Sequence, residues 1–193
     1  MIKLGVLGST KGTDLQAIIN AINSGALKAQ VSVVISNKSK SYILERARLN
    51  QIPSFFVSTK NKTRSQFDSE ITNLLIKKEV GLVLLIGFMR ILSAKFCQKW
   101  HKKIINVHPS LLPKYSGGMD TNVHSEVLKN NDRETGCTIH FVTEEVDSGP
   151  ILVQKRCSVN KQDTISSLKK KVQKLEGDAF IEAIKTLSIR SVS

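Results

Sequence analysis

The sequence predicts an α/β protein with a mostly parallel sheet, helices on both faces, a C-terminal antiparallel hairpin and a long final helix. Two observations carry this prediction. Up to residue 108, short apolar runs alternate with segments whose apolar residues recur at helical spacing, which is typical of strand–helix–strand units. The run at 81–87 is continuously apolar, as expected of a central strand that is covered on both faces.

The expected elements follow one another with short connections. Before residue 113 we expect strands at 3–7, 31–35, 54–57, 81–87 and 104–108, and helices at 14–22, 42–49, 63–78 and 94–100. After residue 113 we expect a loop at 114–121 with paired glycines, a helix at 123–128, antiparallel strands at 138–142 and 151–157, and a long helix from Thr164 through Leu187.

The turn between the first strand and the first helix is a candidate phosphate site. Residues 8–13 read Gly-Ser-Thr-Lys-Gly-Thr, and Gly25 is expected to end the helix that follows. Free backbone N–H groups and the helix dipole favour an anion at such a turn. The signal is weak by itself, because the turn matches neither the dinucleotide-binding nor the Walker pattern.

The segment Ile104–Pro113 carries the strongest functional signal. Asn106 and His108 are two residues apart, so their side chains leave the same face of an extended strand. Pro109 cannot donate to the sheet and ends the strand there. Ligands of open α/β sheets bind just outside the carboxyl ends of strands. A lone histidine is more often a core residue. The neighbouring Asn106, and the end of the strand at Pro109-Ser110, favour a functional site over that interpretation.

Asp147 lies in the turn between the two expected antiparallel strands, where an aspartate is ordinary turn chemistry. It gains a role if the fold brings it to His108, because a carboxylate orients an imidazole and stabilises its charged form. Asn106, His108 and Asp147 would then supply an oxyanion stabiliser, an acid and the carboxylate that tunes it. No serine or cysteine nucleophile stands in an obvious motif, which favours direct attack by a substrate nucleophile.

Length and composition set the class of protein. A chain of 193 residues is expected to form one domain, residues 1–193. The three cysteines have no C-x-x-C spacing, so we expect reduced, buried residues and neither disulfides nor a zinc site. The N-terminal apolar run is too short for a secretory signal, and the run at 80–89 is far shorter than the ~20 residues of a membrane helix. We therefore expect a cytoplasmic protein with no membrane partner.

The net charge of +13 raises the question of nucleic acid. The cations are scattered, and an aromatic content of 5% leaves few rings on which bases could stack. A basic surface that attracts small anionic substrates is the preferred interpretation. A non-catalytic nucleic-acid-binding domain stays open as the alternative from another class.

Three segments resemble the folate-dependent formyltransferases: Asn106–Pro113, Thr135–Val142 and Val146–Ile151. The resemblance covers nearly the whole chain, and the N-H-x-P core with the later aspartate is specific for this superfamily. It implies a Rossmann-like sheet with a C-terminal β-hairpin and helix. Residues 8–16, residues 88–92 and the length resemble most the members that formylate glycinamide ribonucleotide.

The resemblance implies an enzyme of purine biosynthesis. Its co-substrate would be 10-formyltetrahydrofolate, its acceptor the amine of glycinamide ribonucleotide, and no metal would be needed. It would act on these small molecules as a monomer or homodimer, without nucleic acid. Relatives that formylate methionyl-tRNA append a C-terminal β-barrel, and formyl-folate hydrolases an N-terminal regulatory domain. The chain has no room for either, so both are kept as alternatives only.

The resemblance also assigns residues by position. The catalytic residues would be Asn106, His108 and Asp147. The ribonucleotide would contact Gly12, Thr13, Asp14, Gln173, Lys174, Leu175 and Glu176, with Glu176 at the ribose hydroxyls. Formyl-folate would contact Arg64, Met89, Arg90, Ile91, Leu92, Asn106, Thr143, Glu144, Glu145, Val146 and Asp147.

Two features depart from the pattern of the family. Asp14 stands where many relatives have asparagine, and a carboxylate repels a phosphate. We therefore expect Asp14 to cap its own helix, leaving Thr13, Lys11 and backbone N–H groups for the phosphate. The loop Ser116–Thr121 is longer than in some relatives, and the resemblance does not define its conformation.

Overall fold

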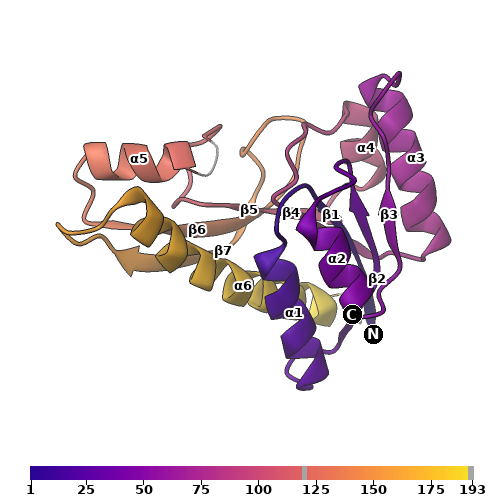
Figure 1. Cartoon of the computed structure of the whole chain (residues 1–193), viewed down its shortest axis with the longest axis horizontal. Coiled ribbons are helices and arrows are strands. Elements are labelled where there is room, and N and C mark those ends of the chain that lie inside the picture. Colours follow the sequence, from indigo (N-terminus) through magenta and orange to yellow (C-terminus); the bar gives the residue numbers. More distant parts are fainter. Residues whose placement is uncertain (119–120, 191–193) are drawn as a thin grey trace.

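The computed structural model describes residues 1–118 and 121–190, which form one seven-stranded sheet flanked by helices (Figure 1). The strands are β1 (Ile2–Gly8), β2 (Ala29–Ser36), β3 (Ser54–Phe56), β4 (Leu82–Ile86), β5 (Ile104–His108), β6 (Glu134–Phe141) and β7 (Ile151–Ser158). The helices are α1 (Thr13–Asn23), α2 (Tyr42–Leu49), α3 (Arg64–Lys77), α4 (Ala94–Lys99), α5 (Thr121–Lys129) and α6 (Ile165–Arg190).

The strand order is β3-β2-β1-β4-β5-β6-β7. The pairs from β3 to β5 are parallel, whereas β6 pairs antiparallel with both β5 and β7. The predicted α/β fold, with a mostly parallel sheet, an antiparallel C-terminal pair and a long last helix, is confirmed. The order also places a topological switch point between β1 and β4, where open α/β sheets bind ligands.

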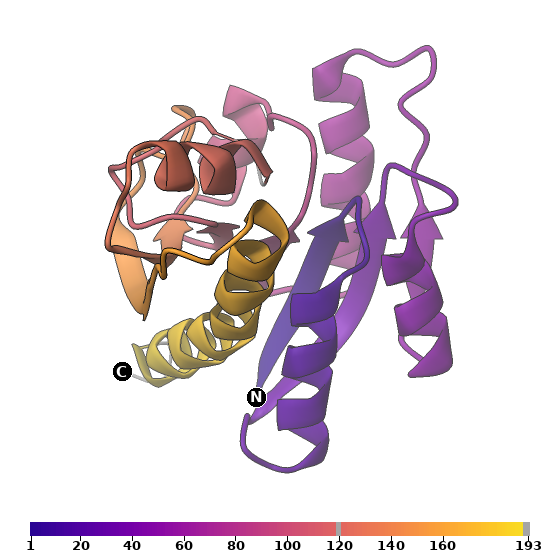
Figure 2. The same cartoon turned by 60° about the vertical axis from the view of Figure 1, so that its left-hand side comes forward.

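Alternating residues of the central strands feed two hydrophobic cores, which explains their continuous apolar runs. On one face, Leu84 of β4 packs in a core shared with α1, α2 and α6. On the other, Leu85 packs in a core shared with Phe67 of α3 and Phe96 of α4. Figure 2 shows α1 and α6 on the same side of the central strands, with α3 behind them.

Local signals set several boundaries. Thr63 and Gln66 form a capping box at the start of α3, and Gly25 follows α1 in the left-handed conformation with φ of 76°. The cysteines are free, with Cys97 and Cys137 buried and Cys157 half-buried. Of the loop expected at Ser116–Thr121, Met119 and Asp120 lie outside the described residues.

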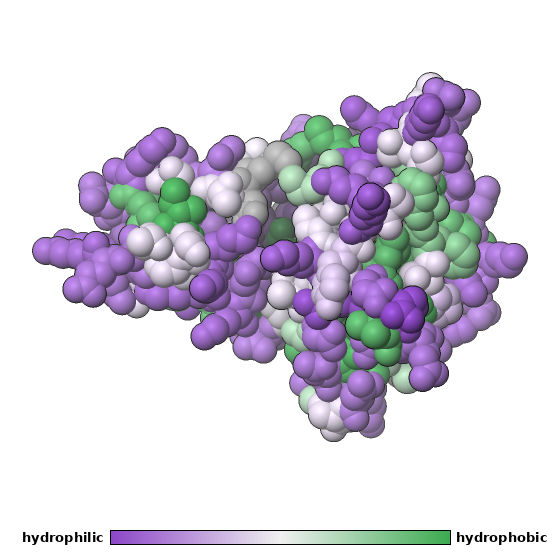
Figure 3. Space-filling view, viewed as in Figure 1, coloured by the Kyte–Doolittle hydropathy of each residue, from purple (hydrophilic) through white to green (hydrophobic). Residues whose placement is uncertain are grey.

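The surface is largely polar. Figure 3 shows hydrophilic side chains over most of the face on which it looks, in keeping with the net charge of +13. In the described part of the chain, no helix combines the length and apolar character that crossing a membrane requires.

Candidate active site

The carboxyl end of β5 positions two of the three predicted catalytic residues. Ile105 points into the core that contains α1 and α6, so Asn106 and His108 both leave the opposite face of the strand. The antiparallel neighbour β6 places His140 opposite Asn106 and Thr138 opposite His108. His108 and His140 are both buried, and Asn106 is half-buried.

The connection between β6 and β7 brings Asp147 to this strand end. Asp147 Oδ2 lies 3.1 Å from His108 Nδ1, and its Oδ1 lies 3.5 Å from His140 Nε2. The backbone N–H of Gly117 donates a hydrogen bond of 2.8 Å to the same carboxylate. The structure therefore brings Asn106, His108 and Asp147 together, as the sequence predicted.

Gly149 allows this connection to lie close against β6. A Cβ at Gly149 would stand 1.8 Å from the carbonyl oxygen of Phe141, which is a backbone atom and cannot rotate away. Phe141 in turn donates its N–H to the Pro150 carbonyl over 2.9 Å. The position of Asp147 thus depends on a residue without a side chain two positions later.

The surroundings of Asp147 keep it ionised. Burial would raise the pKa of this carboxyl group, but the contacts with His108 and His140, the hydrogen bond from the Gly117 N–H and the charge of His108 outweigh burial. The pKa is held well below its usual range. At neutral pH the pair therefore contains a full carboxylate.

His108 lies between two acceptors. Its Nδ1 faces the Asp147 carboxylate, and its Nε2 lies 2.9 Å from the carbonyl oxygen of Tyr115. Both ring nitrogens of His108 therefore face oxygen acceptors. This geometry is the one that the acid role assigned to His108 requires.

His140 belongs to the same cluster and was missed by the sequence analysis. Its Nδ1 donates to the Phe141 carbonyl over 2.9 Å, and its Nε2 lies 3.2 Å from the Asn106 side-chain nitrogen. With the proton on Nδ1, the bare Nε2 accepts a hydrogen bond from the Asn106 amide and orients it, and Asp147 Oδ1 lies 3.5 Å from the same nitrogen. The signal available was the spacing of Thr138 and His140, which repeats that of Asn106 and His108.

The turn after β1 has the backbone expected of a phosphate site. Gly12 occupies the N-cap position of α1 in the left-handed conformation, with φ of 68°, and Thr13 opens the helix with an exposed side chain. Arg46 of α2, also missed by the sequence analysis, donates from Nε to the Lys11 carbonyl over 2.7 Å. A guanidinium is thereby held beside the turn.

The prediction that Asp14 caps its helix is wrong. Gly12 holds the cap position, and no side chain makes a capping hydrogen bond there. Asp14 is the second residue of α1 and points inward, with 5% of its surface exposed. Among the described residues, its Oδ1 atom has no hydrogen-bond partner.

Helix α6 carries the second segment assigned to the ribonucleotide. Gly177 lets α6 approach α1, since a Cβ there would lie 2.6 Å from the Cβ of Ala17. Glu176 is buried beside this contact, Lys174 is exposed, and Gln173 and Leu175 are half-buried. The helix that carries the residues assigned to the ribonucleotide therefore packs against the helix that follows the Gly12 turn, although the two lie far apart in the chain.

The residues assigned to formyl-folate lie in two loops that flank α4. Met89 and Ile91 are exposed in the first loop, Leu92 is part of the core, and the Arg90 guanidinium lies 4.7 Å from the centre of the Phe67 ring. Arg64 is exposed at the start of α3. The first loop is anchored at both ends: the Met89 N–H donates to Ser9 Oγ over 3.0 Å, and the Ser93 N–H donates to Asp68 over 2.6 Å.

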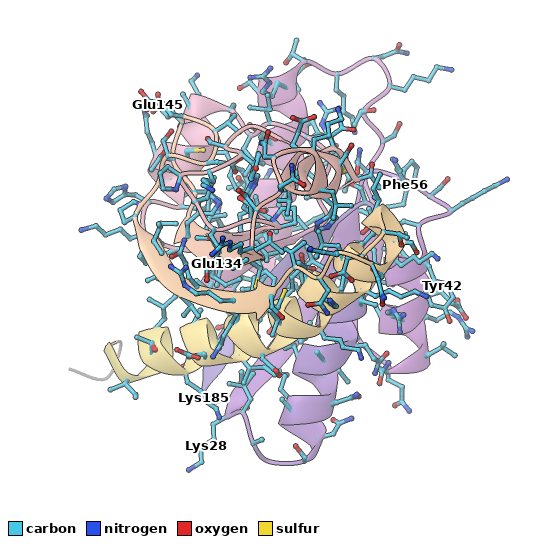
Figure 4. All side chains as sticks on the ribbon, turned by 90° about the vertical axis from the view of Figure 1, so that its left-hand side faces the viewer. Lys28, Tyr42, Phe56, Glu134, Glu145 and Lys185 are labelled. Atoms are coloured by element: carbon cyan, nitrogen blue, oxygen red, sulfur yellow. The ribbon has the colours of Figure 1, made fainter. Side chains whose placement is uncertain are left out.

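The second loop contains Thr143, Glu144, Glu145 and Val146. Glu144 accepts a hydrogen bond of 2.9 Å from Gln98 of α4, and the Cys97 thiol lies 3.5 Å from the Thr143 carbonyl. Figure 4 shows Glu145 at the outer rim of the molecule. Glu144, Glu145 and Val146 are exposed and Thr143 is half-buried, so these side chains are accessible to a ligand.

Two further features lie outside this arrangement. Across the described residues, no group of three or more His, Cys, Asp or Glu side chains is placed to hold a metal ion. A cavity of about 220 Å³ beside Tyr115 contains none of the predicted site residues, and its charges pair with one another: Lys114 with Asp132 and Arg156 with Glu134.

Comparison with known proteins identifies the family. The profile of the formyl transferase family matches residues 2–184. The chain belongs to the formyl transferase family. It is 40% identical to the phosphoribosylglycinamide formyltransferase of Haemophilus influenzae over 96% of this chain and 86% of that protein. It is 38% identical to the Escherichia coli enzyme of the same name over 89% of this chain and 80% of that protein.

Longer relatives contain a similar segment. The chain is 39% identical to the human trifunctional purine biosynthetic protein adenosine-3, of which it spans 19%. Among solved structures, it matches glycinamide ribonucleotide transformylase 1 of Symbiobacterium toebii with a TM-score of 0.91 and 36% identity, over 95% of this chain and 86% of that one. A formyltetrahydrofolate deformylase of Pseudomonas syringae, at 23% identity and a TM-score of 0.86, shares the fold.

At the end of β5, this member of the formyl transferase family presents a buried imidazole, an oriented amide and a buried carboxylate. Such a group stabilises negative charge that develops on a carbonyl oxygen, because its donors are already held in place before reaction. The roles of Asn106, His108 and Asp147 stay predictions that variants test.

The Asp147–His108 pair is expected to act as a unit. Asp147→Asn should lower kcat by roughly 10²–10⁴. The alkaline limb of the pH–rate profile should move to lower pH, because an imidazolium without its carboxylate loses its proton more readily. The double variant with His108→Ala should be little worse than the worse single variant. Steady-state kinetics of the four proteins test this, and additive losses would contradict it.

Gly149→Ala is expected to displace Asp147. The new Cβ clashes with a backbone oxygen, so the loop has to move, and both kcat and the melting temperature should fall. Gly81→Ala is the matched control, since its Cβ would meet no atom closer than 3.8 Å. Thermal unfolding and kinetics of both variants provide the measurement. A fully active Gly149→Ala protein would show that the close approach is not required.

Proposed function

We propose that the protein transfers the formyl group of 10-formyltetrahydrofolate to the amine of glycinamide ribonucleotide. The observation that carries this proposal is the His108–Asp147 pair at the end of β5, with the Asn106 amide held beside it. The family and the 40% identity to a phosphoribosylglycinamide formyltransferase support the choice of reaction.

The proposed reaction begins with attack of the ribonucleotide amine on the formyl carbon. A new C–N bond forms, and the carbonyl electron pair moves onto oxygen. The Nε2–H of His108 is the ring proton that is not directed at Asp147, so it is available to this oxyanion in exchange for the Tyr115 carbonyl. The Asn106 amide supplies a second donor, and the Asp147 carboxylate stabilises the charged ring.

Collapse of the tetrahedral intermediate completes the transfer. The bond between the formyl carbon and the folate nitrogen breaks, and the carbonyl re-forms. The attacking nitrogen loses a proton and the departing folate nitrogen gains one, so the products are the formylated ribonucleotide and tetrahydrofolate. Two neutral amines exchange one formyl group, and no oxidant or reductant is consumed.

The regions around the pair match the two substrates in chemistry. The Gly12 turn, with Thr13 and Arg46, is suited to the ribonucleotide phosphate, and the buried Glu176 is suited to ribose hydroxyls. The two loops that flank α4 would hold formyl-folate. Residues 1–193 as one domain, a monomer or homodimer as the assembly, and a cytoplasmic location stay predictions.

Product formation with and without the acceptor tests the proposal directly. Tetrahydrofolate should appear from 10-formyltetrahydrofolate only when glycinamide ribonucleotide is present. Equal release without the ribonucleotide would indicate a hydrolase. No turnover together with RNA binding that weakens steeply between two salt concentrations would indicate a nucleic-acid-binding protein.

The phosphate turn is tested by Gly12→Ala. A side chain there is strained by the positive φ and would meet Ile43 at 2.5 Å, so the turn has to shift. The KM for the ribonucleotide should rise about tenfold or more, whereas the KM for formyl-folate should change little. Gly25→Ala is the control, because it has a similar positive φ of 76° at the other end of α1 with no atom within 4 Å. Equal changes in both KM values would contradict the assignment.

A further inference from the structure

Asp14 is a buried acid at the edge of the phosphate turn, and nothing in the proposed reaction uses it. Its side chain follows Gly12 by two residues, is 5% exposed, and has an oxygen without a hydrogen-bond partner among the described residues. Burying an unpaired carboxylate is strongly unfavourable, so such a group tends to hold a proton. Burial accordingly raises the pKa of Asp14 to about 7.

A second carboxyl group lies in the same region. Burial raises the pKa of the Cys137 thiol of β6 to about 12. The charge of Glu176 and, to a smaller extent, that of Asp14 add to this effect. Both acids therefore lie near this neutral thiol. Two carboxylates in one buried region repel each other, which further disfavours ionisation of both at once.

The nearby cations do not neutralise Asp14. Lys11 in the turn and Lys174 on α6 are exposed, and the Arg46 guanidinium of α2 is directed at the Lys11 carbonyl and the Gln16 side chain. Within the described part of the chain, none of these three cations forms an ion pair with Asp14. Among the described residues, the acid thus lies at the start of α1 without an ion-pair partner.

We propose that Asp14, the second residue of the helix that follows the phosphate turn, is protonated in the nucleotide complex, so that binding of the phosphate dianion takes up one proton. This inference rests on the proposed function, because it takes the Gly12 turn as the phosphate site. A neutral carboxylic acid donates an O–H hydrogen bond, as an asparagine amide donates an N–H. Protonation therefore lets an aspartate replace an amide beside a phosphate.

The consequence is a definite pH dependence. A phosphate monoester is a dianion above its second pKa of about 6, so the charge of the phosphate changes little above neutral pH. Free Asp14 loses its proton as the pH rises through about 7, and the complex regains it. By linkage, affinity should fall about tenfold per pH unit above that point. The uptake by Asp14, taken as the difference between the wild type and Asp14→Asn, should approach one proton near pH 8 and fall close to zero near pH 6, because the proton that the phosphate monoanion releases there cancels in the difference.

Isothermal titration of the full-length protein with glycinamide ribonucleotide tests the proposal. Titrations in two buffers of different ionisation enthalpy give the number of protons taken up, near pH 6 and near pH 8. The wild type should take up about one proton at the higher pH, and Asp14→Asn close to none, with a Kd that no longer rises between pH 7 and 8. Asp178→Asn, on the exposed side of α6, removes the same charge and should behave as the wild type.

Each other result overturns the proposal. Tight binding by the wild type without proton uptake refutes it, and so does uptake that persists in a folded Asp14→Asn protein. If Asp14→Asn does not fold, the wild-type titration near pH 8 still decides. Absence of any ribonucleotide binding would refute the proposed function, and this inference with it, and is distinct from binding without proton uptake.

Discussion

The buried contact between the His108 ring and the Asp147 carboxylate is the interaction on which the candidate active site depends. A buried pair offsets its desolvation cost only when its remaining donors and acceptors are satisfied as well. Here the Gly117 N–H donates to the carboxylate, and the Tyr115 carbonyl faces the other ring nitrogen of His108. Strands β5 and β6, the loop between them and the connection to β7 have to converge for these contacts to form.

The strand order explains why two substrates would meet at this pair. The turns after β1 and β4 leave the sheet side by side at its switch point, and β5 ends next to them. Ser9 joins the turns, because its N–H donates to the Gly87 carbonyl and its hydroxyl accepts from the Met89 N–H. An amine delivered from the β1 side and a formyl group delivered from the β4 side would then approach each other at His108.

The sequence misplaced Asp14 and did not reveal the positions of His140 and Arg46, and each of these failures has a physical cause. Asp14 was expected to cap α1 because aspartate is a good cap, but Gly12 adopts the left-handed conformation and starts the helix earlier, which turns Asp14 inward. His140 carries no local motif, since its role arises from the register between β5 and β6. Arg46 reads as a surface charge of a helix until α2 is seen to lie against the phosphate turn.

The features that could be predicted from the sequence are local and follow from its periodicity. Apolar spacing predicted the strands and helices, and Asn106 and His108 could be paired because a strand repeats every two residues. Which groups meet across the chain was decided only by the tertiary structure. Asp147 reaches His108 through a loop that a glycine allows to approach β6, and helix α6, which carries Glu176, packs against α1 through the contact of Gly177 with Ala17. Burial, and with it the protonation of Asp14, likewise depends on all the segments that exclude water from it, so no local pattern could reveal it.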